Sequence, residues 1–142
     1  MLDTNIIVGA FVAPYGVLAS IVSSWRLGEI EVVVSEEILD EYKRALGYEK
    51  IRKVHSMSNE DIEEAIDELK EIAIVVEPKE KLLIVQGDPD DNKFFECALA
   101  GDADVIVSGD KKVLDVGVYK SVYVLPPAQF ARMIKEEVEA LL

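Results

Sequence analysis

Short apolar runs alternate with amphipathic segments along the whole chain. Apolar residues spaced three and four positions apart are typical of helices that bury one face, and short β-branched runs are typical of buried strands. This pattern predicts helices over residues 16–27, 36–46, 59–71 and 89–100, and from residue 126 onward. It predicts strands over residues 30–35, 73–78, 82–85, 104–110 and 121–125, after a short opening strand that ends at Asp3. Residues 48–57 and 111–116 are interpreted as short helices or turns.

The order of these elements indicates the fold class. Strands alternate with helices throughout, and the strands are continuously apolar rather than alternately apolar and polar. Both features favour a parallel sheet that is covered by helices on its two faces. The length of 142 residues suits one domain with a sizeable core, and we find no internal repeat, linker or low-complexity segment. The chain is therefore expected to be a single α/β domain.

Polar residues predict where two of the helices begin. Ser35 directly precedes the helix over residues 36–46, and a serine at this position accepts a hydrogen bond from the first turn. Ser58, followed by Asp61, approximates a capping box ahead of the helix over residues 59–71. Both boundaries therefore have a hydrogen-bonding reason as well as a periodic one.

Composition and charge narrow the class of protein. No apolar stretch approaches the roughly 20 residues of a membrane span and no signal peptide is visible, so a cytoplasmic location is expected. The single cysteine, Cys97, excludes an internal disulfide and is expected to be buried in an apolar helix. The formal net charge of −13 argues against broad non-specific binding of nucleic acid. A bound divalent metal would invert the local field, so charge alone does not identify the partner.

Four acidic residues are predicted to meet at one edge of the sheet. Asp3 and Asp110 end predicted strands, and Asp91 begins a predicted helix. All strands of a parallel sheet point the same way, so their carboxyl ends share one edge, where such folds bind ligands. Glu41 lies on a helix that begins at the same edge. At about 100° per residue, it falls at the margin of that helix's apolar stripe.

Three aspartates crowd the start of the helix over residues 89–100, and their expected roles differ. Asp88 fits an N-cap, because a proline follows it at the first helical position. Asp90 leans toward Lys93 on the outer part of the helix. Asp91 lies on the apolar side, which is expected to face the sheet.

Two interpretations of the acids remain open. Each strand-end aspartate could simply cap a helix or complement its dipole. Their convergence at one edge, with Glu41 beside them, favours a site instead. Crowded carboxylates without a counter-charge repel one another and raise one another's pKa values, and a hard divalent cation removes that cost. Ligands that are all oxygen suit Mg²⁺ or Mn²⁺.

Four motifs carry a resemblance to a known family. In chain order they are LDTNI (2–6), SEEILDEY (35–42), DPDDNKFFECALAGDAD (88–104) and IVSGDKKVL (106–114). Their order and spacing resemble those of the PIN domain family of metal-dependent nucleases, and within it the VapC-like toxins of toxin–antitoxin pairs. Each motif alone is weak, whereas the ordered set is specific and covers nearly the whole chain.

The resemblance implies a fold and an activity. The implied fold is a single domain over residues 1–142, a three-layer α/β/α sandwich whose central, mainly parallel sheet has the first strand in its middle. The implied activity is cleavage of RNA with Mg²⁺ or Mn²⁺. A homodimer and an antitoxin protein are the implied partners.

The resemblance also implies which residues form the site. The family's catalytic and metal-binding acids fall on Asp3, Glu41, Asp91 and Asp110. Polar family positions that help to shape the site fall on Thr4, Asn5 and Ser108. These four acids are the same ones that the strand-end positions and the helix stripe pick out.

The N-terminus departs from the family pattern. Family members carry several hydrophobic residues before DTN, whereas Met1 and Leu2 alone precede it here. A central strand this short would bury little surface and pair poorly. The expectation is that the native start lies upstream, or that the chain is trimmed.

Basic residues beside the acids are candidates for binding RNA phosphates. The densest basic segment follows Glu41 closely in the sequence, and two lysines directly follow Asp110. The candidates are Lys43, Arg44, Arg52, Lys53, Lys111 and Lys112. The alternative is that they form a solvated helical face. His55 lies in the same basic segment, where a surface role is expected rather than general-base catalysis.

The expected chemistry is metal-assisted hydrolysis of a phosphodiester bond. Asp3, Asp91 and Asp110 are expected to hold one or two ions, directly or through water. Glu41 is expected to complete the site, either as a ligand or by orienting the attacking water.

Other functions remain as alternatives. They are a housekeeping RNA-processing PIN nuclease, and a non-catalytic module whose acids recruit a metal or a partner. A dehalogenase-type phosphatase is disfavoured because Asn5 occupies the second acidic position of its Asp-x-Asp motif. A phospho-acceptor receiver is disfavoured because Ser35 and Glu36 do not supply its lone aspartate.

Overall fold

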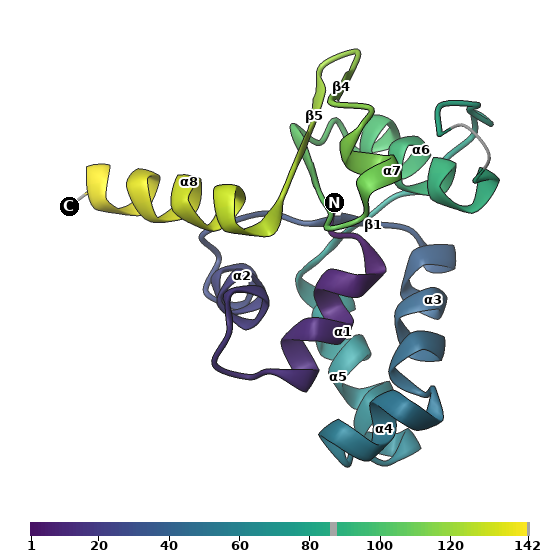
Figure 1. Cartoon of the computed structure of the whole chain (residues 1–142), viewed down its shortest axis with the longest axis vertical. Coiled ribbons are helices and arrows are strands. Elements are labelled where there is room, and N and C mark those ends of the chain that lie inside the picture. The colour runs from purple at the N-terminus through teal and green to yellow at the C-terminus, as the bar shows by residue number, and fades with distance from the viewer. Residues whose placement is uncertain (86–87, 142) are drawn as a thin grey trace.

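Helices and short strands are mixed along the chain, as expected for the α/β class. The computed structural model describes residues 1–85 and 88–141 (Figure 1). Its helices are α1 (Thr4–Val12), α2 (Val17–Arg26), α3 (Glu36–Leu46), α4 (Glu49–His55), α5 (Asn59–Ile72), α6 (Asn92–Ala100), α7 (Lys111–Leu114) and α8 (Pro127–Ala140), and a 3-10 helix, η1 (Pro89–Asp91), precedes α6. Its strands are β1 (Val33–Val34), β2 (Ile74–Val75), β3 (Val105–Val107), β4 (Val118–Tyr119) and β5 (Val122–Leu125).

The strands pair in two small sheets. β1 is parallel to β2, with Val33 opposite Ile74. In the other sheet β3 is parallel to β5 and β4 is antiparallel to β5, in the order β3-β5-β4. The predicted parallel pairing is therefore present in both sheets, whereas β4 is an addition that the sequence pattern did not predict. Within the described residues the two sheets are not joined into one.

The predicted opening strand is reduced to a single bridge. Leu2 pairs in parallel with Val107, and the Asp3 N–H donates to the Val107 carbonyl at 3.0 Å. On another side, the hydroxyl of the fully buried Tyr42 donates to the Leu2 carbonyl at 2.5 Å. This two-residue segment is therefore bonded to β3 through its backbone and to α3 through a side chain.

The predicted strand over residues 82–85 is wrong. This segment is irregular, and side chains of α6 bind its backbone. Asn92 Oδ1 accepts hydrogen bonds from two consecutive N–H groups of the segment, both at 2.8 Å. Glu96 Oε2 accepts one from the Leu82 N–H at 2.9 Å. Because these oxygens satisfy the backbone donors, the segment lies beside α6 without a neighbouring strand.

Capping is confirmed at the two helix starts where polar residues predict it. The Ser35 hydroxyl accepts a hydrogen bond from the Ile38 N–H at 3.2 Å. Ser58 and Asp61 form a reciprocal capping box, with both hydrogen bonds at 3.0 Å. The C-terminal helix likewise begins at Pro127, as predicted.

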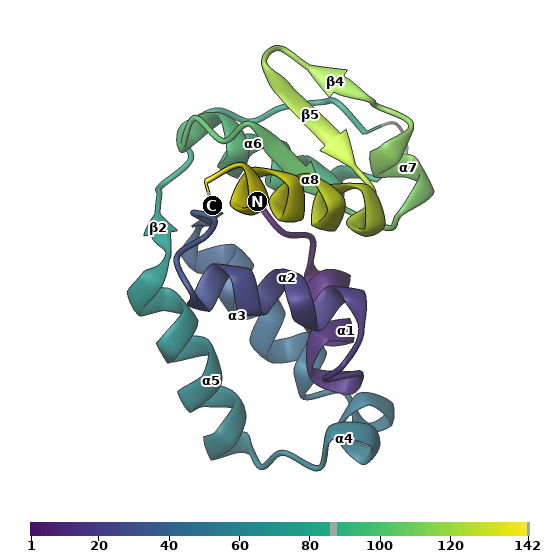
Figure 2. The same ribbon diagram turned by 90° about the vertical axis from the view of Figure 1, so that its left-hand side faces the viewer.

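One continuous hydrophobic core connects two groups of elements. Figures 1 and 2 show α1, α3, α4 and α5 on one side, and the β3-β5-β4 sheet with α6 and α7 on the other. Helix α6 packs against β1 as well as β3, so it contacts both sheets. Helix α8 follows β5 and packs against α2. Trp25, Tyr42 and Phe95 are among the largest fully buried side chains, and Cys97 is buried as predicted.

Within residues 1–85 and 88–141, no single helix has the length and apolarity to cross a membrane. Helices α1 and α2 together reach that length and apolarity, but across a bend of 103°.

We predict that Tyr42→Phe lowers the free energy of unfolding by about 1–2 kcal/mol. The ring remains, but the buried Leu2 carbonyl loses the phenolic donor that binds it. Urea denaturation measures the change. Tyr48→Phe is the matched control, because Tyr48 is exposed, and it is expected to stay within about 0.5 kcal/mol of the wild type. Equal effects of the two substitutions would contradict the role of the Tyr42 hydroxyl.

Candidate functional site

Asp3 lies where the chain leaves its bridge to β3 and enters α1. Its side chain is buried, and Oδ2 accepts a hydrogen bond from the Ser108 hydroxyl at 2.6 Å. Asp3 occupies the N-cap position of α1, but its side chain makes no capping hydrogen bond. The hydrogen bond of this carboxylate is therefore to the residue that directly follows β3, although the nearby backbone amide of Asn5 also stabilises its charge.

Asp110 is connected to Asp3 through the same serine. The Asp110 N–H donates to the Ser108 hydroxyl oxygen at 3.0 Å, and that hydroxyl is fully buried. Asp110 also accepts a hydrogen bond from the Lys112 N–H at 2.9 Å through Oδ1, so it caps α7. The capping interpretation is therefore correct for Asp110. The cap uses Oδ1 alone of the two carboxylate oxygens.

Asp91 ends η1, directly before α6. Its Oδ2 is buried and finds no hydrogen-bond partner among the described residues. The Asp91 side chain makes no capping hydrogen bond to α6 either. A buried carboxylate oxygen without a donor is costly, and a bound cation is one way to satisfy it.

The pKa values of these aspartates reflect their burial and their crowding. The pKa of Asp91 is raised to about 7, first by burial and then by neighbouring carboxylates. In order of effect, these neighbours are Asp88, Asp110 and Asp3. Burial also raises the pKa of Asp3; the Ser108 hydroxyl partly opposes that rise, and the charge of Asp110 adds to it. The three predicted aspartates therefore act on one another electrostatically, which requires them to lie in one region.

Glu41 differs from the aspartates because a lysine neutralises it. It is turned inward on α3, as its position at the margin of the apolar stripe predicts, and its side chain is 25% exposed. Lys93 Nζ pairs with Oε1, and the Thr4 hydroxyl donates to Oε2. Glu41 therefore links the beginnings of α1 and α6 to the middle of α3.

The stretch before α6 is shorter as a helix than the sequence predicts. Asp88 precedes η1, and the Asp91 N–H donates to the Asp88 carbonyl at 3.2 Å, so the first turn is a 3-10 turn. The α-helix begins later, at Asn92. Asp88 therefore stands at the predicted boundary, and its Oδ2 lies 3.8 Å from Lys112 Nζ.

The structure differs from the predictions for Asp90 and Asn5. Asp90 is exposed as expected, but Lys93 pairs with Glu41, so the predicted approach of Lys93 to Asp90 is wrong. The Asn5 side chain is also exposed, and the effect of this residue on the acids comes from its backbone amide, which lowers the pKa of Asp3. Thr4 and Ser108, by contrast, bind predicted acids directly through their hydroxyls.

The basic segment that follows α3 lies far from the aspartates. Helix α4, which carries Arg52 and Lys53, is at the opposite end of the molecule from α6 and α7 (Figures 1 and 2). Lys53 pairs with an acid of its own helix at 3.6 Å, and Lys43 pairs with Glu63 of α5 at 3.0 Å. Arg44 is exposed in the last turn of α3. The expected proximity of Arg52 and Lys53 to the acidic edge is therefore wrong.

Lys111 and Lys112 remain beside the acids. Both lie in the first turn of α7, directly after Asp110, and their side chains are 87% and 59% exposed. Lys111 pairs with Asp115 at 3.0 Å. Of the six basic candidates, these two are the ones that the structure holds next to a predicted acid.

The donor chemistry of the aspartates suits a hard divalent cation. Asp3, Asp91 and Asp110 form no ion pair within the described part of the chain, so their charges lack a basic partner. Their side chains are not gathered into a cage, because among the described residues no three acidic, histidine or cysteine side chains lie close enough to hold one ion. An ion at this edge would therefore need side-chain rotation or bridging water.

Lys93 is the neighbour of the acids that sequence analysis missed as part of the site. Its position in the chain, two residues after Asp91, was visible, but its partner lies 52 residues away on α3. Helical spacing relates residues within one helix, so it carries no signal for a contact between two helices.

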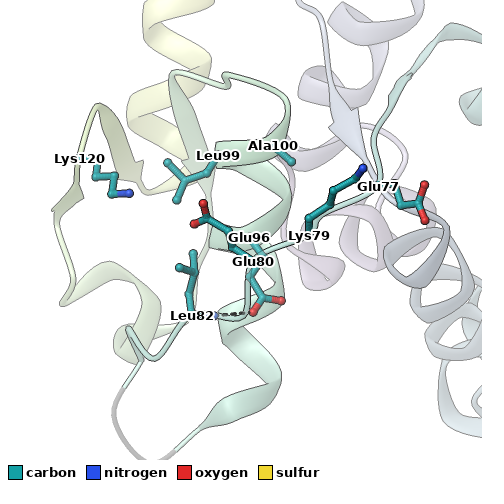
Figure 3. Close-up of a pocket in the computed structure, with 8 residues that line it drawn as sticks. All are labelled: Glu77, Lys79, Glu80, Leu82, Glu96, Leu99, Ala100 and Lys120. Carbon is teal, nitrogen blue, oxygen red and sulfur yellow. Dashed lines mark hydrogen bonds between the residues drawn. The ribbon is translucent and has the colours of Figure 1, made fainter.

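Two cavities lie beside α6, and none of the four predicted acids lines either of them. The first, of about 430 Å³, lies between residues 77–82, α6 and Lys120 (Figure 3). The second, of about 530 Å³, is lined by Ser35, Lys93 and Glu96 among others. Acidic side chains outnumber lysines in the lining of both cavities, so their charge does not favour anionic ligands such as RNA phosphates.

Comparison with known proteins identifies the family. A family model described as PIN domain matches residues 1–112, so the chain belongs to the PIN domain family. PIN domains are generally nucleases that act on RNA or other nucleic acids and typically use divalent metals. The matched residues contain all four predicted acids together with Lys93. No curated protein and no solved structure was found to match the chain.

We predict that Asp91→Asn stabilises the metal-free protein at pH 8. The pKa of Asp91 is about 7 in the folded chain against 3.8 ordinarily, so between about pH 4 and pH 7 the folded state holds a proton that the unfolded state has lost. At pH 8 both states are ionised, and the folded state bears the full cost of the buried charge. The contribution of Asp91 to the free energy of unfolding therefore falls as pH rises from about 4 through about 7. The expected gain is about 1 kcal/mol, because water screens the half-buried carboxylate, and it shrinks at pH 5.

Chemical denaturation in EDTA at pH 8 and pH 5 measures this gain. Asp90→Asn is the matched control, since Asp90 is the exposed neighbour, and we expect little change at either pH. A gain for Asp91→Asn that is equal at both pH values would contradict the assigned pKa.

Proposed function

We propose that this protein is a metal-dependent endoribonuclease that hydrolyses RNA phosphodiester bonds. The observation that carries the proposal is the set of Asp3, Asp91 and Asp110 on a PIN domain, carboxylates that influence one another without a basic partner among the described residues. The buried, unpartnered Oδ2 of Asp91 supports a cation in particular. Oxygen-only donors favour Mg²⁺ or Mn²⁺.

The roles of the residues follow from their surroundings. Asp3, Asp91 and Asp110 hold one or two ions, directly or through water, and Ser108 orients Asp3 by its hydrogen bond. When bound, the metal lowers the pKa of a water and stabilises negative charge on the phosphate. Glu41 stands beside these acids on α3, either as a ligand or in a supporting position. The reaction requires no side-chain nucleophile.

We further propose that the chain is a single PIN-like domain over residues 1–142, with the three-layer arrangement of the family, and the toxin of a VapC-like toxin–antitoxin pair. The order of the four motifs supports that subtype. Its partners are then a second copy of the chain and an antitoxin protein. A small reading frame beside its gene that encodes a DNA-binding N-terminus would favour the toxin, and its absence would favour a housekeeping RNA-processing nuclease.

Lys111 and Lys112 are the proposed contacts for RNA phosphates next to the cut. They are exposed, and they follow Asp110 directly at the start of α7. Positive charge here would offset the repulsion between the acidic chain and the RNA backbone.

Asp110→Asn is predicted to lower Mg²⁺-dependent cleavage of RNA by about a hundredfold or more, the scale for loss of one electrostatic contact in an active site. Asparagine is as good an N-cap as aspartate, so α7 should remain formed while the charge is lost. A gel assay with single-stranded RNA, with and without EDTA, measures the rate. Asp115→Asn, an exposed acid at the end of α7, should keep full activity. Full activity of Asp110→Asn would refute the assignment.

Charge reversal tests the RNA contacts in the Asp110→Asn background, where the substrate is preserved. Lys111→Glu with Lys112→Glu is expected to weaken RNA binding at low salt by about tenfold. Arg52→Glu with Lys53→Glu, on the remote α4, is expected to change it by less than about twofold. Fluorescence anisotropy with labelled RNA measures both. A larger loss of RNA affinity for the α4 variant than for the α7 variant would instead place the RNA contacts on α4.

A further inference from the structure

Lys93 is a basic side chain held inside an acidic neighbourhood. It is 13% exposed, and its ammonium pairs with Glu41 and lies 5.6 Å from the centre of the Phe94 ring. Lysine is rarely buried to this extent unless it is paired. The Thr4 hydroxyl binds the other oxygen of Glu41, so both oxygens of that carboxylate are engaged by the protein itself.

The aspartates of the site have no such partner. Asp3, Asp91 and Asp110 form no ion pair within residues 1–85 and 88–141. The buried Oδ2 of Asp91 also lacks a hydrogen bond there. The four acids therefore fall into two kinds: three whose charges no basic side chain neutralises, and Glu41, which belongs to a nearly neutral pair.

We propose that Lys93 divides the acids of this site. Asp3, Asp91 and Asp110 face the cation, whereas the ion pair with Lys93 keeps Glu41 from binding it. Lys93 and Glu41 are then positioning residues that fix α6 against α3 beside the site. This inference rests on the proposed function, because it assumes the cation site of that proposal.

The proposal has a specific electrostatic consequence. Seen from the cation, the pair contributes almost no net charge, since its two charges are adjacent and opposite. Removal of one member exposes the charge of the other, whereas removal of both leaves the field nearly unchanged. The two substitutions should therefore show strong non-additivity, which a double-mutant cycle measures.

Binding of Mn²⁺ to the full chain, measured by isothermal titration calorimetry without RNA, tests this. Lys93→Met is expected to tighten Mn²⁺ binding by about threefold to tenfold, because it leaves the negative charge of Glu41 uncompensated. Glu41→Gln is expected to weaken binding by a similar factor, because it leaves the Lys93 ammonium uncompensated. The double variant is expected to bind within about twofold of the wild type. If Glu41 were instead a ligand, the double variant would bind at least about tenfold more weakly, and the proposal would be overturned.

A second ion pair supplies the matched control. Glu49 and Lys53 pair at 3.6 Å on α4, far from the site, so Glu49→Gln with Lys53→Met repeats the same chemical change there. Neither the single nor the double control variants should alter Mn²⁺ affinity by more than about twofold. An equal response at both pairs would overturn the assignment to Lys93.

Two further measurements distinguish a variant that fails to fold from a folded variant that has lost Mn²⁺ binding. Thermal unfolding in EDTA identifies the folded variants, and the double variant leaves no unpaired charge in the place of the pair. Lys93→Arg keeps the charge and should bind Mn²⁺ as the wild type does; tenfold tighter binding would contradict the proposal. If the wild type binds no Mn²⁺, the cation site of the proposed function is wrong. If it binds and the double variant is tenfold weaker, the division of the acids alone is wrong.

Discussion

The mutual repulsion of carboxylates at one edge is the constraint around which this structure is organised. Asp3, Asp91 and Asp110 come from three distant segments, and parallel strand pairing brings the first and the last of them together. Burial raises the pKa of Asp3 and of Asp91, and the charge of Asp110 raises both further. A fold that served stability alone would not gather these charges, because their repulsion opposes folding at neutral pH. Such a cost is typical of functional sites, where a ligand relieves it.

The molecule limits this cost with few groups. The buried Ser108 hydroxyl accepts the Asp110 N–H and donates to Asp3, so one side chain connects two of the acids. Lys93 removes the charge of Glu41, and the Thr4 hydroxyl completes its hydrogen bonding. Asp91 is left with an unpartnered oxygen among the described residues. The repulsion that remains is therefore concentrated where a divalent cation would be most strongly attracted.

Side chains also form hydrogen bonds to backbone groups that neighbouring strands would bind in a larger sheet. The segment over residues 82–85 is held by Asn92 and Glu96 of α6, and the N-terminal segment is held by Tyr42 of α3. Each of these bonds satisfies a backbone group that would otherwise need a neighbouring strand. The strands themselves remain short, and α6 packs against both sheets. The edge that carries the acids therefore depends on side-chain hydrogen bonds as well as on strand pairing.

Local interactions explain what the sequence by itself determined. Most of the helices, the caps at Ser35 and Ser58, and the positions of the acids at element boundaries depend on residues within about four positions, so periodicity and spacing predict them. Helix α1 is the exception: its residues are apolar on all sides, and the pattern did not predict it. The ordered motifs likewise indicated the PIN domain family before the family match over residues 1–112. An apolar run such as residues 82–85 looks the same whether another strand or a side chain satisfies its backbone.

The tertiary structure alone decided which partners the charged groups found. Lys93 meets Glu41 across 52 residues because the start of α6 lies within side-chain reach of α3. Arg52 and Lys53 lie far from the aspartates because α4 follows the distant end of α3. Such contacts depend on how helices pack, and no spacing within one element encodes them. The sequence therefore determined which residues could form a site, and packing determined which of their charges are neutralised.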